Sequence, residues 1–249
     1  MKGKVYLVGA GPGGAWLTPS CVFGLLRSAD VVLYDKLVDP SLLSSAFKAE
    51  KIFVGKTVGK HAMKQEEINE LMIKLAKEGK VVVRLKGGDP FVLGRGDEEC
   101  EALLEAGVEC EVVPAPTSAT AVPACAGIPV TRRNLANTFA VATGWAAEGS
   151  EKPKYGEMLK VVDTLVVLMG VSKAEEIVKE VVEAVGDVPS AAIMKGCTEE
   201  QKVVIARASK LPEVMRRNGI KPPSVLVFGE VVRWAWEKGL VRDVLECSL

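Results

Sequence analysis

The chain has 249 residues, which is long enough for one large domain or two modest ones, each with its own core. Apolar residues make up 48%, charged residues 26%, and the formal net charge is 0, so the composition excludes a disordered chain and gives no global charge that would attract nucleic acid or an anionic membrane. No apolar run reaches the length of a membrane-spanning helix, and residues 1–4 lead directly into a strand, so we expect neither a transmembrane helix nor a cleaved signal peptide.

The first part of the chain alternates strands with helices. Strands are expected at 4–8, 30–34, 80–85 and 110–113, and helices at 19–27, 65–78 and 98–106. Strands that alternate with helices at this spacing are typical of a parallel, doubly wound sheet. The sequence therefore predicts an N-terminal α/β lobe over residues 1–113.

The second part of the chain predicts another α/β lobe over residues 114–249. Residues 114–133 are rich in Pro, Ala and Thr and are expected to carry the chain across to it. Strands are expected at 138–143, 164–168, 191–194, 203–206 and 225–228, and helices at 174–184 and 211–217. The fourth of these strands follows the third with little room for a crossover helix, so this sheet should be mixed.

The amino-terminal segment matches the G-x-G-x-x-G pattern of dinucleotide-binding folds through Gly9, Gly11 and Gly14, with Asp35 placed where a ribose-binding acid would lie. That pattern requires a helix that begins inside the glycine loop, so that its first N–H groups meet the pyrophosphate. Here the pair 18–19, Thr-Pro, reads as a helix N-cap followed by the first helical residue, which starts the helix too late. The dinucleotide interpretation is therefore disfavoured.

A second glycine turn, Gly87-Gly88-Asp89-Pro90, ends the apolar segment at 81–85. Glycines allow a sharp turn and the close approach of a ligand to the backbone. A strand that ends in glycines, with charged residues after it, is how an open α/β sheet presents a binding crevice. The simpler alternative is a plain strand-ending turn.

Cysteine and histidine usage bounds the redox and metal chemistry. The six cysteines form no C-x-x-C pair and lie mostly in apolar or helical stretches, which predicts buried free thiols in a reducing cytoplasm, without a disulfide framework or a zinc site. The chain has one histidine, so a His-rich metal site is excluded, and we expect no metal.

Several segments occur together in an order that resembles a known family. They are VYLVGAGPG and ADVVLYDKLV, VGKTVGKH followed by QEEIN, VVVRLKGGDPFVLGRGDEE, PTSATAVPACAGIPVTRR, and later LMGV, KGCTEEQ and VLVFGEVV. The chain resembles the tetrapyrrole methylases of the cobalamin and sirohaem pathways, and within them the uroporphyrinogen-III C-methyltransferases. The resemblance covers nearly the whole chain. It implies a two-lobed α/β fold, usually a homodimer, that binds S-adenosylmethionine between the lobes and methylates C2 and C7 of uroporphyrinogen III to give precorrin-2.

The resemblance also implies site residues. It assigns the cofactor pocket to Pro12, Gly87, Gly88, Asp89, Val92, Thr117, Ser118, Met169 and Cys197. It assigns substrate handling or proton removal to Asp35, Arg95 and Glu98. The substrate carries carboxylates, so cationic side chains in loops after strands are expected to bind it. These are Lys56, His61, Arg132 and Arg133, with Lys60 and Arg95 also considered.

The chain departs from the family pattern at several positions. Gly14 replaces an Asp, Lys36 an Arg, Arg132 and Trp145 each a His, and Ala115 begins an APTSA segment in place of GITSA. These departures leave another precorrin or cobalt-precorrin methylase as the alternative. From other classes, a dinucleotide-dependent oxidoreductase would bind NAD(P)H or flavin, and a non-catalytic tetrapyrrole-binding protein would never consume S-adenosylmethionine.

Overall fold

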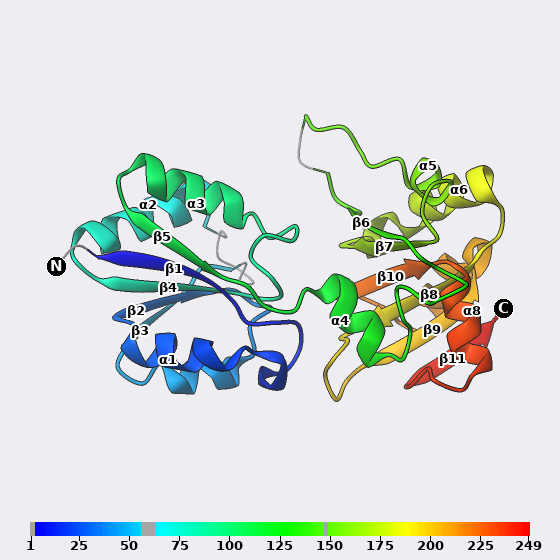
Figure 1. Cartoon of the computed structure of the whole chain (residues 1–249), viewed down its shortest axis with the longest axis horizontal. Coiled ribbons are helices and arrows are strands. Elements are labelled where there is room, and N and C mark those ends of the chain that lie inside the picture. Colours follow the sequence, from blue (N-terminus) through cyan, green and yellow to red (C-terminus); the bar gives the residue numbers. More distant parts are fainter. Residues whose placement is uncertain (1–2, 56–62, 147–148) are drawn as a thin grey trace. The chain divides into compact units, whose positions relative to one another are not determined.

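The computed structural model describes residues 3–55, 63–146 and 149–249. The chain forms two compact units, Met1–Thr117 and Ser118–Leu249, where the sequence predicted a division after residue 113. Each unit is an α/β sandwich with helices on both faces of one sheet (Figure 1). The α/β class, with one parallel and one mixed sheet, is confirmed.

The sheet of unit 1 has the order β3-β2-β4-β1-β5, and all its strands are parallel. Its strands are β1 (Lys4–Gly9), β2 (Val31–Tyr34), β3 (Glu50–Phe53), β4 (Val81–Lys86) and β5 (Glu109–Val113). Because parallel strands share one direction, their carboxyl ends meet at one edge of the sheet. The loops that carry the predicted site residues of this unit follow that edge. The sequence missed β3, a short edge strand whose first half is exposed.

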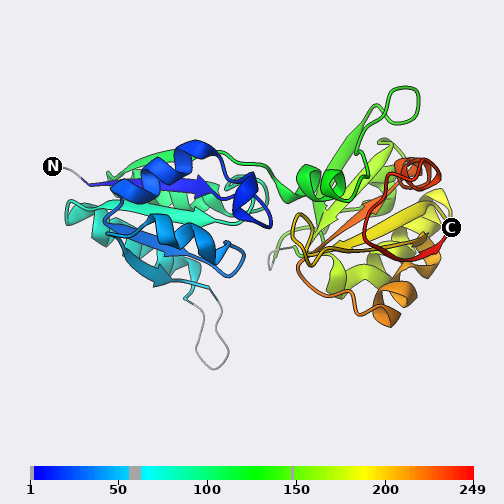
Figure 2. The same cartoon turned by 90° about the horizontal axis from the view of Figure 1, so that it is seen from below.

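Helices cover both faces of this sheet. They are α1 (Ser20–Ser28), α2 (Gln65–Lys77) and α3 (Gly96–Glu105), with the 3-10 turns η1 (Ala15–Leu17) and η2 (Pro40–Ser45). Val82 packs on the α2 and α3 face, whereas Val83 and Leu85 pack on the α1 face, because side chains alternate along a strand. In Figure 2, α1 (blue) lies in front of the strands.

The start of α1 confirms that no helix begins in the first glycine loop. The helix starts at Ser20, after Pro19 as its N-cap. The expectation that Thr18 caps it is wrong, since the Thr18 hydroxyl donates to the carbonyl oxygen of Ala10 at 2.7 Å. That bond ties the glycine loop to the segment that follows it.

The sheet of unit 2 has the order β11-β9-β8-β10-β7-β6. Its strands are β6 (Phe139–Thr143), β7 (Thr164–Leu168), β8 (Pro189–Met194), β9 (Lys202–Arg207), β10 (Ser224–Phe228) and β11 (Val244–Ser248). β8 and β9 pair antiparallel, as the short connection between them predicts, and β6 pairs parallel with β7. Edge strand β11 was not predicted.

Two groups of helices cover this second sheet. They are α4 (Ser118–Cys125) and α8 (Glu230–Glu237), which contact one face, and α5 (Tyr155–Leu159), α6 (Ala174–Val185) and α7 (Leu211–Arg217), which pack on the other. Residues 114–133 are therefore more than a crossing segment. They contain α4, whose Ala119 and Val122 are buried within unit 2.

The cysteine prediction is wrong for four of the six residues. Cys100 in α3 is disulfide-bonded to Cys110 in β5, with the Cα atoms 5.9 Å apart. Cys125 at the end of α4 is bonded to Cys197, with the Cα atoms 5.4 Å apart. Sequence spacing carries no signal for either pair, because each is brought together by packing between elements. Cys21 and Cys247 are free, and Cys21 is exposed where a buried thiol was expected.

Candidate functional site

Two glycine loops meet at the carboxyl end of the unit 1 sheet. Gly11 and Gly88 form an isolated antiparallel bridge, with the Gly11 N–H donating to the Gly88 carbonyl at 3.2 Å and the Gly88 N–H donating back at 2.8 Å. Their φ angles are 76° and 71°, values that favour glycine. The bridge fixes the loop containing Pro12 beside the Gly87–Pro90 turn, so the two segments form one backbone surface.

Close packing explains two other glycines in this region. A Cβ on Gly87 would lie 2.6 Å from the Leu37 Cβ, and one on Gly9 would lie 2.6 Å from the Ala115 Cβ. Either contact would force the loops apart. A plain strand-ending turn would explain a glycine at one position only. Here the loops after β1, β2, β4 and β5 pack against each other, so this edge of the sheet forms a continuous, ordered surface.

Asp89 closes the turn with both carboxylate oxygens. Its Oδ1 accepts the N–H of Phe91 at 2.9 Å, and its Oδ2 accepts the N–H of Ala115 at 3.1 Å. Each oxygen has a second lone pair for a ligand. Val92, in the same turn, donates its N–H to the Asp89 carbonyl at 3.4 Å. The carboxylate therefore holds the APTSA segment against the glycine turn.

The structure brings two of the three predicted catalytic residues into direct contact. Arg95 lies before α3 with φ 59°, and its guanidinium donates from Nε and NH2 to Glu98 at 3.0 and 2.6 Å. This fork lowers the pKa of the Glu98 carboxyl and raises the pKa of Arg95, the side-chain hydrogen bond being the main cause in both. About half of each side chain is exposed. The two hydrogen bonds hold the Arg95 guanidinium in one position, and the Glu98 carboxylate balances its charge.

The third, Asp35, follows β2 at the same edge. Its Oδ1 accepts the N–H of Leu37 at 2.9 Å, and its Oδ2 lies 3.6 Å from Arg84 NH2. That second distance is a charge contact, longer than a hydrogen bond. Asp35 keeps 26% of its side chain exposed.

Below Asp35 lies a cluster of buried charges that sequence reasoning missed. Glu99 Oε1 accepts from Arg84 Nε at 3.1 Å and from Gln65 Nε2 at 3.1 Å, while its Oε2 accepts from Lys86 Nζ at 2.8 Å. Arg84 and Lys86 are each 5% exposed and Glu99 is fully buried. A signal was present, since two cations two residues apart in an apolar strand point to the same face of the sheet.

The cluster changes the acidity of Lys86. Burial lowers the pKa of its ammonium, the neighbouring Arg84 guanidinium acts in the same direction, and Glu99 opposes both. Lys86 immediately precedes Gly87, so the hydrogen bond from its buried ammonium to Glu99 anchors the start of the glycine turn.

Large apolar side chains are exposed in the loops at this edge. Trp16 follows β1 and is 69% exposed; Leu37 follows β2, and Phe91 and Leu93 follow β4. Exposed aromatic and aliphatic groups beside backbone polar atoms are typical of sites for flat organic ligands. Sequence reasoning did not single out these four residues.

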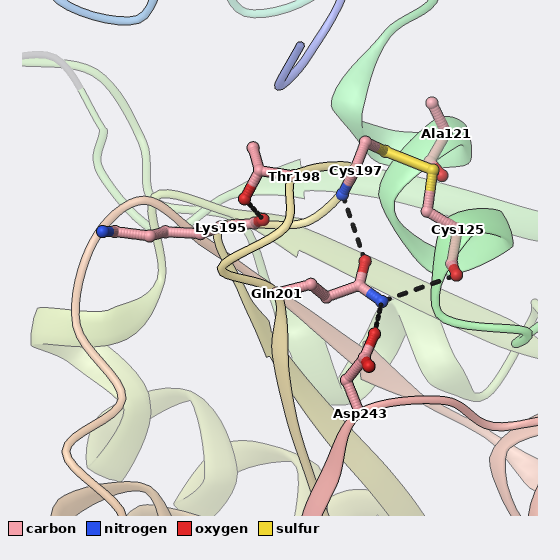
Figure 3. Close-up of a disulfide and its surroundings, with 7 residues drawn as sticks. All are labelled: Ala121, Cys125, Lys195, Cys197, Thr198, Gln201 and Asp243. Carbon is pink, nitrogen blue, oxygen red and sulfur yellow. Dashed lines mark hydrogen bonds between the residues drawn. A yellow bond between two sulfur atoms is a disulfide. The ribbon is translucent and has the colours of Figure 1, made fainter.

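Unit 2 carries the other predicted cofactor residues. Met169 follows β7 with φ 57° and is half exposed, so it is not core packing. Cys197 lies after β8 with φ 63°, and its disulfide joins that loop to α4 (Figure 3). Its N–H donates to Gln201 Oε1 at 3.1 Å, and Gln201 Nε2 donates to Asp243 Oδ2 at 2.8 Å. The loop is therefore held by covalent and polar contacts together.

The remaining predicted residues have diverse settings. Thr117 ends unit 1 and Ser118 begins α4. The Arg132 guanidinium stacks over the Trp234 ring, 4.3 Å from its centroid, and NH1 donates to the Arg133 carbonyl at 3.0 Å. This stacking occupies one face of the Arg132 side chain. Lys56, Lys60 and His61 lie outside the described residues.

Comparisons with known proteins agree with this architecture. A family model described as Tetrapyrrole (Corrin/Porphyrin) Methylases matches residues 4–212. The uroporphyrinogen-III C-methyltransferase of Methanocaldococcus jannaschii is 48% identical over 237 residues, which cover 93% of this chain and 98% of that protein. The siroheme synthase of Chromobacterium violaceum is 44% identical over 94% of this chain, which spans 50% of that longer protein.

A solved structure shares the fold. The crystal structure of uroporphyrin-III C-methyl transferase from Thermus thermophilus, complexed with S-adenyl homocysteine, matches with a TM-score of 0.79 at 42% identity and covers 93% of this chain and 99% of that one. Among the described residues, no helix has the length and apolar character to cross a membrane.

Proposed function

Because the chain belongs to the tetrapyrrole methylase family, we propose that it methylates uroporphyrinogen III at C2 and C7, with S-adenosylmethionine as methyl donor, and so forms precorrin-2. The observation that carries this proposal is the 48% identity to a uroporphyrinogen-III C-methyltransferase over 98% of that protein's length. The complex of a 42% identical relative with S-adenyl homocysteine supports the cofactor.

The backbone surface formed by the Gly11 loop and the Gly87–Pro90 turn of unit 1 can accommodate an adenosyl ligand. Backbone groups near Gly87 and Gly88 can approach a ligand closely, and Asp89 retains acceptor capacity for an ammonium or ribose hydroxyl. We assign cofactor binding to this turn with Pro12, Val92 and Thr117, and on unit 2 to Ser118, Met169 and Cys197. The bound donor supplies an electrophilic sulfonium methyl group.

The protein's own residues then have two tasks. A pyrrole carbon is already nucleophilic, so the protein has to align it and remove a proton after the transfer. We assign carboxylate binding to Arg95, Arg132 and Arg133, together with Lys56 and His61. Arg132 contributes through the guanidinium edges that its stacking on Trp234 leaves open. Asp35 is the better candidate for orienting the pyrrole or receiving its proton, because both carboxylate oxygens of Glu98 already accept hydrogen bonds from Arg95.

The test is incubation with uroporphyrinogen III and isotopically labelled S-adenosylmethionine, followed by mass analysis of the tetrapyrrole. We expect two labelled methyl groups per product.

A variant of the glycine turn tests the cofactor site. In Gly88→Leu, the added side chain and the φ of 71° should abolish adenosyl-ligand binding in calorimetry. Gly107→Leu is the matched control, because its φ is 72° with open space around it. Binding of NAD(P)H without S-adenosylmethionine would overturn the proposal, and methylation of a precorrin alone would favour the family alternative.

We also propose a homodimer located in the cytoplasm. The cytoplasmic location no longer has the support of free thiols, because four of the six cysteines form disulfides. Val122, Ala126 and Ile128 lie in an apolar stretch that could have offered a face to a partner, but they are already buried in the single chain. The dimer therefore rests on the family resemblance. Light scattering should give about 53 kDa, twice the 26.5 kDa chain mass. A mass near that of one chain at micromolar concentration would reject the dimer.

A further inference from the structure

The buried charges beneath Asp35 point to a role in the reaction as well as in stability. We propose that Arg84 is a positioning residue that holds the Asp35 carboxylate in its working orientation, with Glu99 and Lys86 as its buried support. This inference rests on the proposed function and deepens it, because Arg84 would act on the reaction only through Asp35.

Charge balance is the first argument. Arg84 and Lys86 bring two positive charges into the interior, and Glu99 supplies one negative charge. Buried charges are costly unless they are paired. Asp35 is the fourth member, and its Oδ2, 3.6 Å from Arg84, completes the balance. The cluster therefore needs a carboxylate at the position that the family resemblance assigns to substrate handling.

Geometry is the second argument. All three guanidinium nitrogens of Arg84 have partners: Nε donates to Glu99 at 3.1 Å, NH1 donates to the Leu85 carbonyl at 3.2 Å, and NH2 makes the charge contact with Asp35 at 3.6 Å. The planar fork thus spans from α3 to the end of β2. Asp35 Oδ1 is fixed separately by the Leu37 N–H. Contacts to both oxygens set the plane of the carboxylate.

Exposure is the third argument. Three members of the cluster are nearly or fully buried, whereas Asp35 keeps 26% of its side chain exposed. A carboxylate that is partly exposed and is held by contacts to both of its oxygens is arranged like a preorganised functional group. Glu99 follows Glu98 in the first turn of α3, so the same cluster also supports the helix end that carries the Arg95–Glu98 pair.

The decisive experiment is a double-mutant cycle on Arg84→Lys and Asp35→Asn in the full-length protein. Lysine keeps the positive charge and therefore the charge balance of the cluster. It has a single nitrogen, so it lacks the planar guanidinium that contacts Glu99 and Asp35 at the same time. Val83→Ala is the matched control, because Val83 is a fully buried neighbour on the same strand that packs on the opposite face. Single-turnover methylation, the dissociation constant for S-adenosylmethionine and urea unfolding are measured for each variant.

We expect Arg84→Lys to slow single-turnover methylation about tenfold to a hundredfold, the loss typical of a misplaced group, with the dissociation constant for S-adenosylmethionine changed less than about twofold. In the Asp35→Asn background the same change should cost less than about threefold, because its target is already lost. Val83→Ala should lower stability without this loss of rate. Independent, multiplicative losses from Arg84→Lys and Asp35→Asn would overturn the proposal, as would equal rates for Arg84→Lys and Val83→Ala.

Unfolding separates this proposal from the proposed function. If the unaltered protein transfers no methyl group to uroporphyrinogen III, the proposed function fails by itself. The positioning of Asp35 is then decided by the unfolding cycle, in which the losses from the two variants should be less than additive. Strictly additive losses would show that Arg84 does not hold Asp35.

Discussion

At the residue scale, two aspartates hold neighbouring loops together through hydrogen bonds to backbone N–H groups. Asp39 Oδ2 accepts the Ala15 N–H at 2.8 Å and its Oδ1 accepts the Ser41 N–H at 2.9 Å, so one carboxylate ties the turn after the first glycine loop to the start of η2. Asp89 does the same for the second glycine loop. In both loops, side-chain carboxylates replace missing ladder partners for backbone N–H groups.

Replacing Asp39 should therefore reduce stability in a pH-dependent way. The hydrogen bonds, the one from Ser41 above all, lower the pKa of the Asp39 carboxyl in the folded state. Its contribution is present above the ordinary aspartate pKa of about 4 and is lost as the pH falls through the lower folded value. Asp39→Ala should lower the free energy of unfolding by about 1–2 kcal/mol at pH 7, with a smaller gap at pH near 3, measured by urea unfolding.

Asp39→Asn is the control for charge. The amide keeps an acceptor oxygen but has no carboxyl to titrate, so its cost should be smaller than that of Asp39→Ala. A gap between Asp39→Ala and the unaltered protein that is the same at both pH values would mean that the ionised carboxylate is not its cause.

At the scale of elements, disulfides join segments that the sequence keeps apart. Cys125–Cys197 closes a separation of 72 residues between α4 and the loop after β8, whereas Cys100–Cys110 closes 10 residues between α3 and β5. The entropy lost by the unfolded chain grows with the length of the closed loop. The longer connection should therefore contribute more stability.

We expect Cys125→Ser to lower the free energy of unfolding by about 4 kcal/mol and Cys100→Ser by about 2–3 kcal/mol, from loop closure. The measurement is chemical unfolding of the oxidised protein, with a reduced sample of the unaltered protein for comparison. Titration of the unfolded, unreduced protein should find the two free thiols of Cys21 and Cys247. Six free thiols, with no effect of reduction on stability, would restore the free-cysteine prediction.

At the scale of the whole molecule, each unit has a core of its own. In unit 2, α5, α6 and α7 pack on one face of the mixed sheet around Phe228, Ile177 and Leu211. In unit 1, apolar clusters lie on both faces of the parallel sheet. Both partners of each disulfide lie in the same unit.

A fragment of residues 118–249 should therefore fold alone. A domain with its own core and closed connections does not depend on its neighbour for folding. We expect a cooperative thermal transition by circular dichroism and strand and helix content like that of unit 2 in the intact chain. Residues 134–249, which lack α4 and Cys125, are the control and should be less stable. A non-cooperative transition in the longer fragment would show that the units stabilise each other.

Local patterns in the sequence were sufficient for most of the fold. The apolar stripe at Ile68, Met72 and Leu75 predicted α2, and these residues are buried. The β-branched run before Gly87 predicted β4, and the short link between β8 and β9 predicted antiparallel pairing. These features succeed because periodicity and turn chemistry act within about ten residues of chain. Edge strands β3 and β11 were missed because they are half exposed and carry little apolar signal.

The sequence by itself determined the α/β class, the glycine turns, the late start of α1 and, through resemblance, the family and its candidate residues. Tertiary structure alone decided that Cys125 meets Cys197, that Arg95 is forked to Glu98, and that Glu99 lies buried between Arg84 and Lys86. The physical reason is that disulfides and buried ion pairs depend on the distance between side chains from different elements. A linear pattern specifies which face of its own element a side chain occupies, but only packing determines which group it meets there.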